Sequence, residues 1–206
     1  MKLTRTGKFL VCNPFRVYLQ RTFEAPGVLS GFKDAPGSCI EIGCGHGAGA
    51  LLINTYLKPE RLVCIDIDPA MIERAKKYIS RPPRWANKTA SLNISFLCCD
   101  ARQLTFTNQS FDTAILFGVL NSIRQWQQVI FEISRILKPG GILSFKEALA
   151  SGNSSGFNRM IGLKAVITRE SLEASLKKAG FFIQKVVMER RMSCCFIKAV
   201  KDSAGS

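Results

Sequence analysis

A glycine-rich stretch carries the strongest chemical signal in the chain. Residues 41–47, Glu-Ile-Gly-Cys-Gly-His-Gly, follow a short apolar run and lead into a second one, Leu51-Leu52-Ile53. This order predicts a strand, a tight turn and the start of a helix. Glycine lets the backbone turn sharply and lets a ligand approach the main chain, while a helix N-terminus offers free N–H groups and a partial positive charge. The stretch therefore predicts a binding loop for a polar or anionic ligand.

Three interpretations of this loop are open from its residues alone. The spacing Gly43-x-Gly45-x-x-Ala48, with Asp66 downstream, satisfies the fingerprint of dinucleotide-binding folds. The same stretch satisfies E-x-G-x-G-x-G, which is found in enzymes that bind S-adenosylmethionine. The third interpretation is that the glycines only connect a strand to a helix. The choice depends on the residues that follow.

Two aspartates follow later apolar runs at the points where strands are expected to end. Asp66 comes after Leu62–Ile65, and Asp100 comes after Ile94–Cys99. In open α/β sheets, ligands bind at the carboxyl ends of the strands. Asp66 could accept two hydrogen bonds from a ribose diol, which fits both kinds of cofactor. Asp100 could accept the exocyclic amine of adenine while the Ala101 N–H bonds a ring nitrogen; helix capping is the structural alternative for both aspartates.

Apolar runs and amphipathic stretches alternate from Ser38 onwards, which predicts an α/β fold. Strands are expected at about 39–42, 62–65, 94–99, 113–117 and 142–145. Helices are expected at about 48–57, 69–79 and 125–137, the last one ended by a Lys-Pro-Gly-Gly turn at 138–141. Thr168 predicts the N-cap of a further helix that ends at Gly180, and the last two apolar runs, 181–187 and 193–200, predict an antiparallel pair. The expected architecture is a Rossmann-like, doubly wound, mostly parallel seven-stranded sheet with a C-terminal antiparallel hairpin and helices on both faces.

Two segments outside this alternation are expected to shape specificity. Residues 1–33 predict an N-terminal helical extension that begins near Pro14, is broken by Pro26-Gly27 and could act as a lid over the crevice. Residues 149–167 are rich in Gly, Ser and Asn and are long for a connection, which predicts a substrate loop. The 206 residues are expected to form a single domain, 1–206, with its core at 38–206.

Composition limits the partners and the chemistry. The formal net charge of +14 favours an anionic partner such as nucleic acid or an acidic membrane surface, although the basic residues are spread along the chain as on a solvated face. No apolar run approaches the roughly 18 residues of a transmembrane helix, and residues 1–20 lack the apolar core of a signal peptide, so a cytoplasmic protein is expected. The eight cysteines include no C-x-x-C pair and there is one histidine, so neither a metal site nor a structural disulfide is expected.

Five successive motifs resemble those of class I S-adenosylmethionine-dependent methyltransferases. They are the 41–47 loop, Asp66-Ile67-Asp68, Cys99-Asp100-Ala101, Ser110–Ile115 and the Leu-Lys-Pro-Gly-Gly turn at 137–141. The resemblance covers about residues 38–147 and 168–181 and matches the subgroup that methylates small molecules, quinone precursors and phospholipids. It implies the cofactor S-adenosylmethionine, with the methionine end at loop 43–47, the ribose on Asp66 and the adenine between Ile67 and Asp100-Ala101. The cofactor-binding residues that it implies are Glu41, Gly43, Cys44, Gly45, Gly47, Asp66, Ile67, Met71, Asp100, Ala101 and Phe117.

The resemblance also implies an activity, which is in-line transfer of a methyl group from a sulfonium to a small-molecule or lipid-like acceptor. Relatives often carry a histidine after the fourth strand, where this chain has Leu120-Asn121-Ser122. The candidates for acid–base or substrate roles are His46, Asn121, Lys146 and Glu147. Two alternatives stay open: a methyltransferase acting on RNA or another anionic macromolecule, and a non-catalytic cofactor-binding subunit that activates a partner methyltransferase. A dehydrogenase is disfavoured because the chain has no Ser-Tyr-x-x-x-Lys set.

Overall fold

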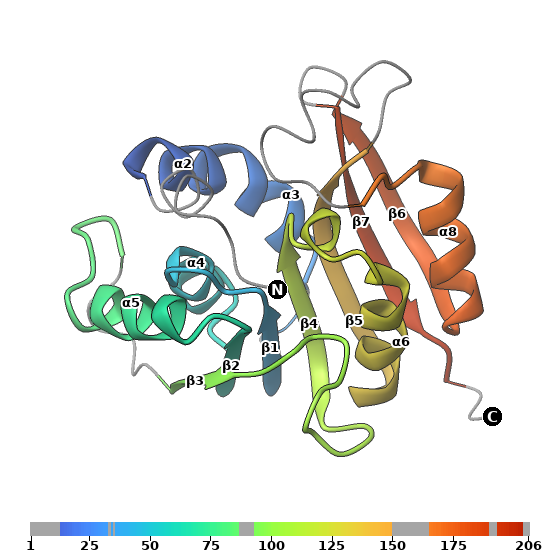
Figure 1. Cartoon of the computed structure of the whole chain (residues 1–206), viewed down its shortest axis with the longest axis horizontal. Coiled ribbons are helices and arrows are strands. Elements are labelled where there is room, and N and C mark those ends of the chain that lie inside the picture. The colour runs from blue at the N-terminus through green and yellow to red at the C-terminus, as the bar shows by residue number, and fades with distance from the viewer. Residues whose placement is uncertain are drawn as a thin grey trace.

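A seven-stranded sheet in the order β3-β2-β1-β4-β5-β7-β6 lies at the centre of the computed structural model, which describes residues 13–32, 34, 36–86, 93–149, 165–189 and 193–203 (Figure 1). Strands β1 to β5 pair in parallel, and β7 runs antiparallel between β5 and β6. The chain order reverses between β1 and β4, so their carboxyl ends flank the switch point at which ligands bind in such sheets. The predicted architecture is confirmed. The strands are β1 (Ser38–Ile42), β2 (Arg61–Asp66), β3 (Ile94–Cys98), β4 (Phe111–Phe117), β5 (Leu137–Ala148), β6 (Phe181–Glu189) and β7 (Cys194–Lys201).

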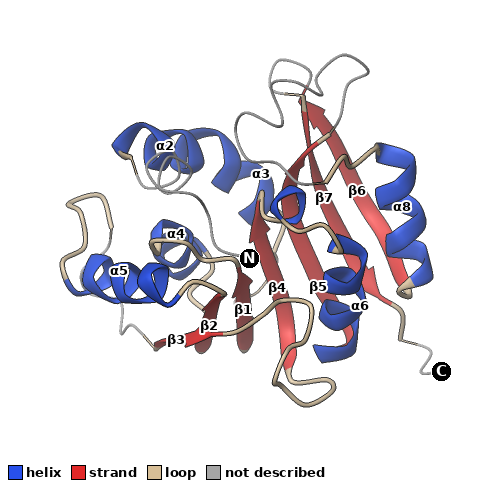
Figure 2. Ribbon diagram, in the orientation of Figure 1, coloured by secondary structure: helices blue, strands red, loops and turns tan. Residues whose placement is uncertain are grey.

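Helices cover both faces of this sheet (Figure 2). One apolar core joins the strands to α6 (Trp126–Ile136) and α8 (Arg169–Lys178). A second core joins them to α3 (Ala25–Leu29), α4 (Ala48–Tyr56) and α5 (Pro69–Ser80). Neighbouring strand residues enter different cores: Ile40 belongs to the first and Cys39 to the second. Parallel strands that are buried on both faces need near-continuous apolar sequence, which explains why these strands were visible as apolar runs.

Capping residues fix the start of the helix that follows β2. Asp68 Oδ1 accepts the Ala70 N–H at 3.0 Å, and Pro69 occupies the first position of α5. This helix therefore starts within three residues of the end of β2, as its sequence predicts. At the other end of the sheet, Thr168 and Ser171 form a capping box at the start of α8.

The N-terminal segment is a continuous helical run, and the predicted break at Pro26-Gly27 is wrong. Helix α2 (Pro14–Leu19) passes into a π-helical turn (Gln20–Glu24) and then into α3 (Ala25–Leu29). Pro26 lies at the start of α3, beside the π turn that shifts the hydrogen-bond register, so its ring and its missing N–H are accommodated. Gly27 lies so close to Phe196 of β7 that an added Cβ would overlap the ring. The Pro-Gly pair thus serves packing and does not end the helix.

Strand β5 also differs from the expected 142–145. It begins at Leu137, which pairs with Phe111, and the pairing with β4 resumes at Ile142 opposite Thr113. The four residues between these two pairs form a bulge in which Gly140 has a φ of 74°. The predicted turn at 138–141 is therefore built into a longer strand, which continues to Ala148 because β7 supplies antiparallel partners.

Parts of two predicted segments lie outside the described residues. These are residues 1–12 of the N-terminal extension and residues 150–164 of the substrate loop. The division of the chain into an extension at 1–33 and a core at 38–206 stays a prediction. No helix in the described part of the chain is long and apolar enough to cross a membrane.

The contact between Gly27 and Phe196 predicts the sign of a stability change. Alanine favours helix over glycine by about 1 kcal/mol, so Gly27→Ala should stabilise an unconstrained helix. Here the new methyl group overlaps the Phe196 ring, and we expect a net loss of about 1 to 2 kcal/mol from overpacking, measured by urea unfolding. The same change in a Phe196→Leu background should cost less. A more stable Gly27→Ala variant would contradict this packing.

Candidate functional site

The glycine loop at the switch point has a backbone that requires glycine. Gly43, Gly45 and Gly47 have φ values of 74°, 54° and 93°, in the left-handed region that other residues rarely adopt. Gly47 packs against α5, where an added Cβ would lie 3.1 Å from the Cα of Ala75. Gly47 is also the N-cap of α4 and supplies no side-chain cap. The loop therefore presents main chain and the start of a helix to whatever binds at the switch point.

Asp66 anchors this loop to the end of β2. Its Oδ2 accepts the Gly45 N–H at 3.0 Å, and its Oδ1 accepts the Asp68 N–H at 2.9 Å. Burial raises the pKa of Asp66, and these N–H groups oppose the shift because they stabilise the carboxylate. Each carboxylate oxygen has a second lone pair, and the side chain is only half-buried. Asp66 can therefore hold the loop and still accept hydrogen bonds from a diol.

Glu41 lies beneath the loop, against the first turn of α4. Glu41 is 2% exposed, and an added Cβ at Gly49 would overlap its carboxyl group. Burial raises the pKa of Glu41 to about 8, a hydrogen bond with Cys64 opposes the rise, and the charge of Asp66 adds to it. Glu41 Oε2 has no hydrogen-bond partner among the described residues. A buried carboxyl that is mostly protonated at neutral pH thus underlies the start of α4.

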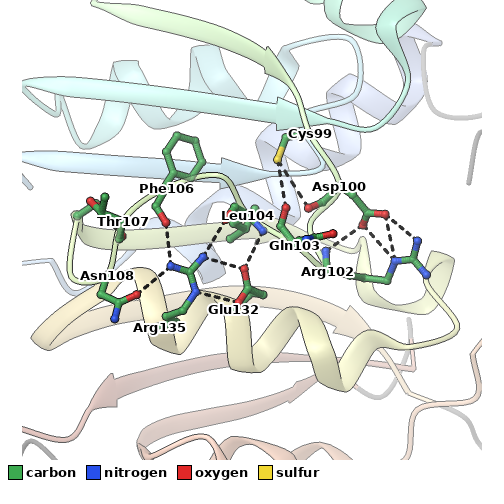
Figure 3. A network of polar contacts seen from close by, with 11 residues as sticks. Cys99, Asp100, Arg102, Gln103, Leu104, Phe106, Thr107, Asn108, Glu132 and Arg135 are labelled. Atoms are coloured by element: carbon green, nitrogen blue, oxygen red, sulfur yellow. Dashed lines mark hydrogen bonds and ion pairs between the residues drawn. The ribbon is translucent and has the colours of Figure 1, made fainter.

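In the turn after β3, Asp100 forms an ion pair and hydrogen bonds with Arg102 (Figure 3). Arg102 Nη2 donates to Asp100 Oδ2 at 2.7 Å, and the Arg102 backbone N–H donates to Oδ1 at 2.9 Å. These bonds hold the pKa of Asp100 below its usual range. Arg102 Nη1 reaches further, to Gln125 Oε1 at 2.7 Å. The predicted contact of Asp100 with adenine requires the carboxylate to be shared with Arg102, a residue that the sequence analysis did not single out.

The rest of this turn is fixed to α6, as Figure 3 also shows. Glu132 Oε2 accepts the Leu104 N–H at 2.7 Å and pairs with Arg135 at 2.8 Å. Arg135 in turn donates to the carbonyl oxygens of Leu104 and Phe106, each at 2.8 Å. The segment that carries Asp100 and the buried Ala101 is therefore held in place by the protein itself.

The end of β4 supplies an apolar wall beside the glycine loop. An added Cβ at Gly49 would lie 3.0 Å from the Phe117 ring, and one at Gly43 would overlap the side chain of Val119. Gly118 between them has a φ of 73°, which permits the turn after the strand. Phe117 lies where the resemblance expects a residue along the cofactor. Val119 was missed because only its tertiary contact with Gly43 distinguishes it from any other apolar residue.

Three of the four candidates for acid–base or substrate roles come together at the end of β5. Glu147 is 1% exposed; its Oε2 accepts the Leu120 N–H and its Oε1 accepts Asn121 Nδ2, both at 2.7 Å. Burial raises the pKa of Glu147, and the hydrogen bond from Asn121 opposes that shift. Asn121 Nδ2 also donates to the Ala148 carbonyl at 2.6 Å. Asn121 and Glu147 therefore hold the 3₁₀ turn at Leu120–Ser122 in place.

Lys146, the third of these candidates, joins the same edge to the N-terminal segment. Its ammonium lies 3.3 Å from the carboxylate of Glu24, which also pairs with Arg16 at 2.9 Å. Glu24 is 5% exposed and sits in the π-helical turn. One glutamate in an amphipathic stretch has no distinguishing pattern, so this role of Glu24 was not predictable from the sequence. His46 stands apart from this group and contacts Tyr78 edge to face, with ring centroids 5.3 Å apart.

Seven cysteines in the described part of the chain are free thiols: Cys39, Cys44, Cys64, Cys98, Cys99, Cys194 and Cys195. Among all the residues that the structure describes, no group of three or more His, Cys, Asp or Glu side chains is placed to hold a metal ion.

The model of a known domain family, described as the methyltransferase domain, matches residues 40–145, which is about half of the chain. The chain belongs to the methyltransferase domain family. The match begins in β1 and ends in β5, so it includes the glycine loop, Asp66 and Asp100. The resemblance noted from the five motifs is confirmed, and S-adenosylmethionine is the cofactor that this membership assigns.

Relatives and solved structures agree with this membership. The phthiotriol/phenolphthiotriol dimycocerosates methyltransferase of Mycobacterium leprae is 30% identical over 108 residues, which are 52% of this chain but 36% of that protein. The chain thus aligns with about a third of the length of this curated relative. A SAM-dependent methyltransferase from Aquifex aeolicus has a TM-score of 0.75 at 15% identity, covering 97% of this chain and 99% of that one. The N-methyltransferase NodS from Bradyrhizobium japonicum, solved with S-adenosyl-L-homocysteine, has a TM-score of 0.68 at 24% identity, covering 93% and 90%.

The residues of the crevice fit S-adenosylmethionine on structural grounds. Asp66 retains lone pairs for a ribose, and the left-handed glycines leave the backbone open to close approach. The unpartnered Oε2 of Glu41 lies at the start of α4, and Phe117 provides an apolar wall. The assignment of individual cofactor-binding residues, Cys44, Ile67 and Met71 included, stays a prediction.

The raised pKa of Glu41 predicts how stability depends on pH. Between about pH 4.5 and 8 the folded chain keeps a proton on Glu41 that the unfolded chain has lost, so this group stabilises the fold most below pH 4.5 and progressively less as the pH rises towards 8. Glu41→Gln removes this dependence. We expect the variant to gain stability relative to the wild type as the pH rises, by at most about 1.4 kcal/mol per pH unit.

Urea unfolding of both proteins at several pH values measures this difference. The exposed Glu73→Gln variant, which loses only a surface pair with Lys76, is the matched control and should run parallel to the wild type. Parallel curves for Glu41→Gln would show that Glu41 is ionised in the folded chain.

Proposed function

We propose that this chain is an S-adenosylmethionine-dependent methyltransferase whose acceptor is a small molecule or a lipid-like molecule. The observation that carries the proposal is the glycine loop held by Asp66 at the switch point of the sheet, within a matched methyltransferase domain. This position, at the carboxyl ends of the parallel strands, is where ligands bind in open α/β sheets, which supports the proposal. Because the aligned part is only 36% of the Mycobacterium leprae relative, the activity rests on this site and not on that relative's name.

The N-terminal segment supports an apolar acceptor. Phe15, Tyr18 and Phe23 are 68%, 53% and 52% exposed, an unusual density of aromatic surface in one short helical run. The ion pair between Glu24 and Lys146 attaches this run to the end of β5, at the edge of the sheet that carries the crevice. An acceptor with a large apolar part would contact such a surface. The name of the Mycobacterium leprae relative, a dimycocerosates methyltransferase, agrees with a lipid-like acceptor.

For this reaction the main role of the protein is to align the methyl donor with the acceptor. When bound, the cofactor supplies a methyl group on a sulfonium, which is already a good electrophile. The protein's residues then hold donor and acceptor in line and exclude water. Glu147 and Asn121 act as positioning residues, because they fix the turn at 120–122. His46, whose pKa burial lowers to about 4, is too weak a base to deprotonate an acceptor at neutral pH.

A methyl-transfer screen tests the activity. The full chain is incubated with methyl-labelled S-adenosylmethionine and separate lipid, small-molecule, RNA and protein fractions of a cell extract. We expect label in the lipid or small-molecule fraction. Label in RNA alone would replace the acceptor class with the anionic alternative that the charge of +14 keeps open. Calorimetry that detects NADH but not S-adenosylhomocysteine would overturn the cofactor assignment. A cytoplasmic location remains part of this proposal.

Asp66 gives the sharpest test of the cofactor site. Asp66→Ala should weaken S-adenosylhomocysteine binding by about 10- to 100-fold, since hydrogen bonds to a charged acceptor each contribute about 1.5 to 3 kcal/mol. Asp66→Asn retains one acceptor and should lose less. Asp34→Ala, at an exposed position, is the control. Unchanged affinity in Asp66→Ala, with the fold intact by circular dichroism, would remove Asp66 from the ribose site.

A further inference from the structure

A cavity of about 400 Å³ lies on the outer side of the glycine loop, between the N-terminal helical segment and the end of α5. Three aromatic side chains form much of its wall: Tyr18, Tyr78 and Trp85. Arg21 and His46 also line it, and the remaining lining consists of two prolines and a valine. None of the predicted cofactor-binding residues lines it. We call it the aromatic cavity.

His46, one of the residues that line this cavity, carries an unsatisfied polar atom. The residue is only 9% exposed, and its Nε2 has no hydrogen-bond partner among the described residues. Leaving a buried polar atom unpaired is unfavourable, because it has lost its hydrogen bonds to water. Burial lowers the pKa of His46 to about 4, and the charges of Arg16 and Arg74 lower it further. The ring is therefore neutral at pH 7, and one nitrogen of a neutral imidazole can donate a hydrogen bond.

The charge around the aromatic cavity is positive. The Arg21 guanidinium lies 5.5 Å from the centre of the Trp85 ring, at the wall of the cavity. Arg16 is close enough to His46 to affect its titration, and its Nη1 is buried without a hydrogen-bond partner among the described residues. Glu24 balances one of these charges through its 2.9 Å pair with Arg16. An anionic group in the cavity would be attracted by these positive charges.

We propose that the aromatic cavity binds a planar aromatic carboxylate. The ring of such a ligand would stack among Tyr18, Tyr78 and Trp85, where aromatic contacts are favourable. Its carboxylate would accept hydrogen bonds from His46 Nε2–H and from the guanidinium of Arg21. The volume lies within the range of small-molecule sites. Because His46 belongs to the glycine loop, the ligand would sit directly beside the crevice without occupying it.

His46 is the only histidine in the chain, so untagged protein with nitrogen-labelled histidine gives a single pair of ring-nitrogen magnetic resonance signals, from Nδ1 and Nε2. The probes are benzoate and 2-naphthoate, with naphthalene methanol and cyclohexanecarboxylate as the uncharged and non-planar controls. We expect 2-naphthoate to shift the Nε2 resonance, to show the Nε2–H tautomer and to bind more tightly than either control. No shift at millimolar 2-naphthoate would overturn the proposal.

Variants distinguish binding at this site from nonspecific binding elsewhere on the protein. His46→Gln and Arg21→Gln should each weaken 2-naphthoate by about 10-fold, the loss of one charge-assisted hydrogen bond, measured by calorimetry. Lys76→Gln, on the exposed side of α5, should leave the affinity unchanged. If His46→Gln fails to fold, Arg21→Gln carries the test. Equal affinity in wild type and Arg21→Gln would overturn the assignment.

The cofactor provides the last discrimination. The titration is repeated with S-adenosylhomocysteine at saturation. The proposal expects 2-naphthoate to bind under both conditions, because the aromatic cavity and the crevice have separate linings. Competition between the two ligands would assign the cavity to the cofactor and overturn the proposal. Failure of S-adenosylhomocysteine to bind while 2-naphthoate still binds would instead refute the proposed function and leave this site intact.

Discussion

The hydrogen bond from the Gly45 N–H to Asp66 is the contact on which the crevice depends. Through it, one carboxylate joins the loop after β1 to the end of β2, and through the Asp68 N–H it also holds the turn into α5. The left-handed glycines fit only while this anchor defines the path of the loop. The carboxylate that anchors the loop is also the one proposed to receive the ribose, so binding would add to an arrangement that the protein already forms.

A second set of buried polar contacts builds the opposite side of the crevice. Glu147 holds the turn after β4, and Glu24 connects Lys146 to Arg16 of the N-terminal segment. Burying carboxylates is costly unless they are paired or hydrogen-bonded, and here each one joins segments that are distant in the sequence. The polar contacts thus specify how the N-terminal run, β4 and β5 meet, while the apolar cores supply most of the driving force.

Local signals explain what could be predicted from the sequence. Apolar runs predicted the strands, Asp68-Pro69 predicted the start of α5, and the glycine spacing predicted the loop. The helix continues through Pro26 beside a π-helical turn, and Gly27 packs against Phe196, some 170 residues away; no local pattern reports either feature. Glu24 and Val119 were likewise missed because their partners are distant in the sequence, whereas Arg102 was missed because an arginine two residues after an aspartate is not a distinctive pattern. The aromatic cavity combines residues near positions 14–21, 46 and 78–85, so only folding brings its chemistry together.

The π-helical turn at Gln20–Glu24 sets the rotational phase of α2 relative to α3. Arg16 and Glu24 are eight residues apart, and in a regular α-helix, at about 100° per residue, they would lie roughly 80° away from a shared face. In the wider π turn each residue rotates the chain by less than about 100° around the helix axis. The smaller rotation brings the two side chains to the same face, where they pair at 2.9 Å. One extra residue is in effect stored there. Deleting one residue within this turn would leave Arg16 and Glu24 seven residues apart, about 20° from a shared face in a regular α-helix. A deletion there should therefore preserve the pair, whereas a deletion elsewhere in α2 would rotate the residues before it by about 100°.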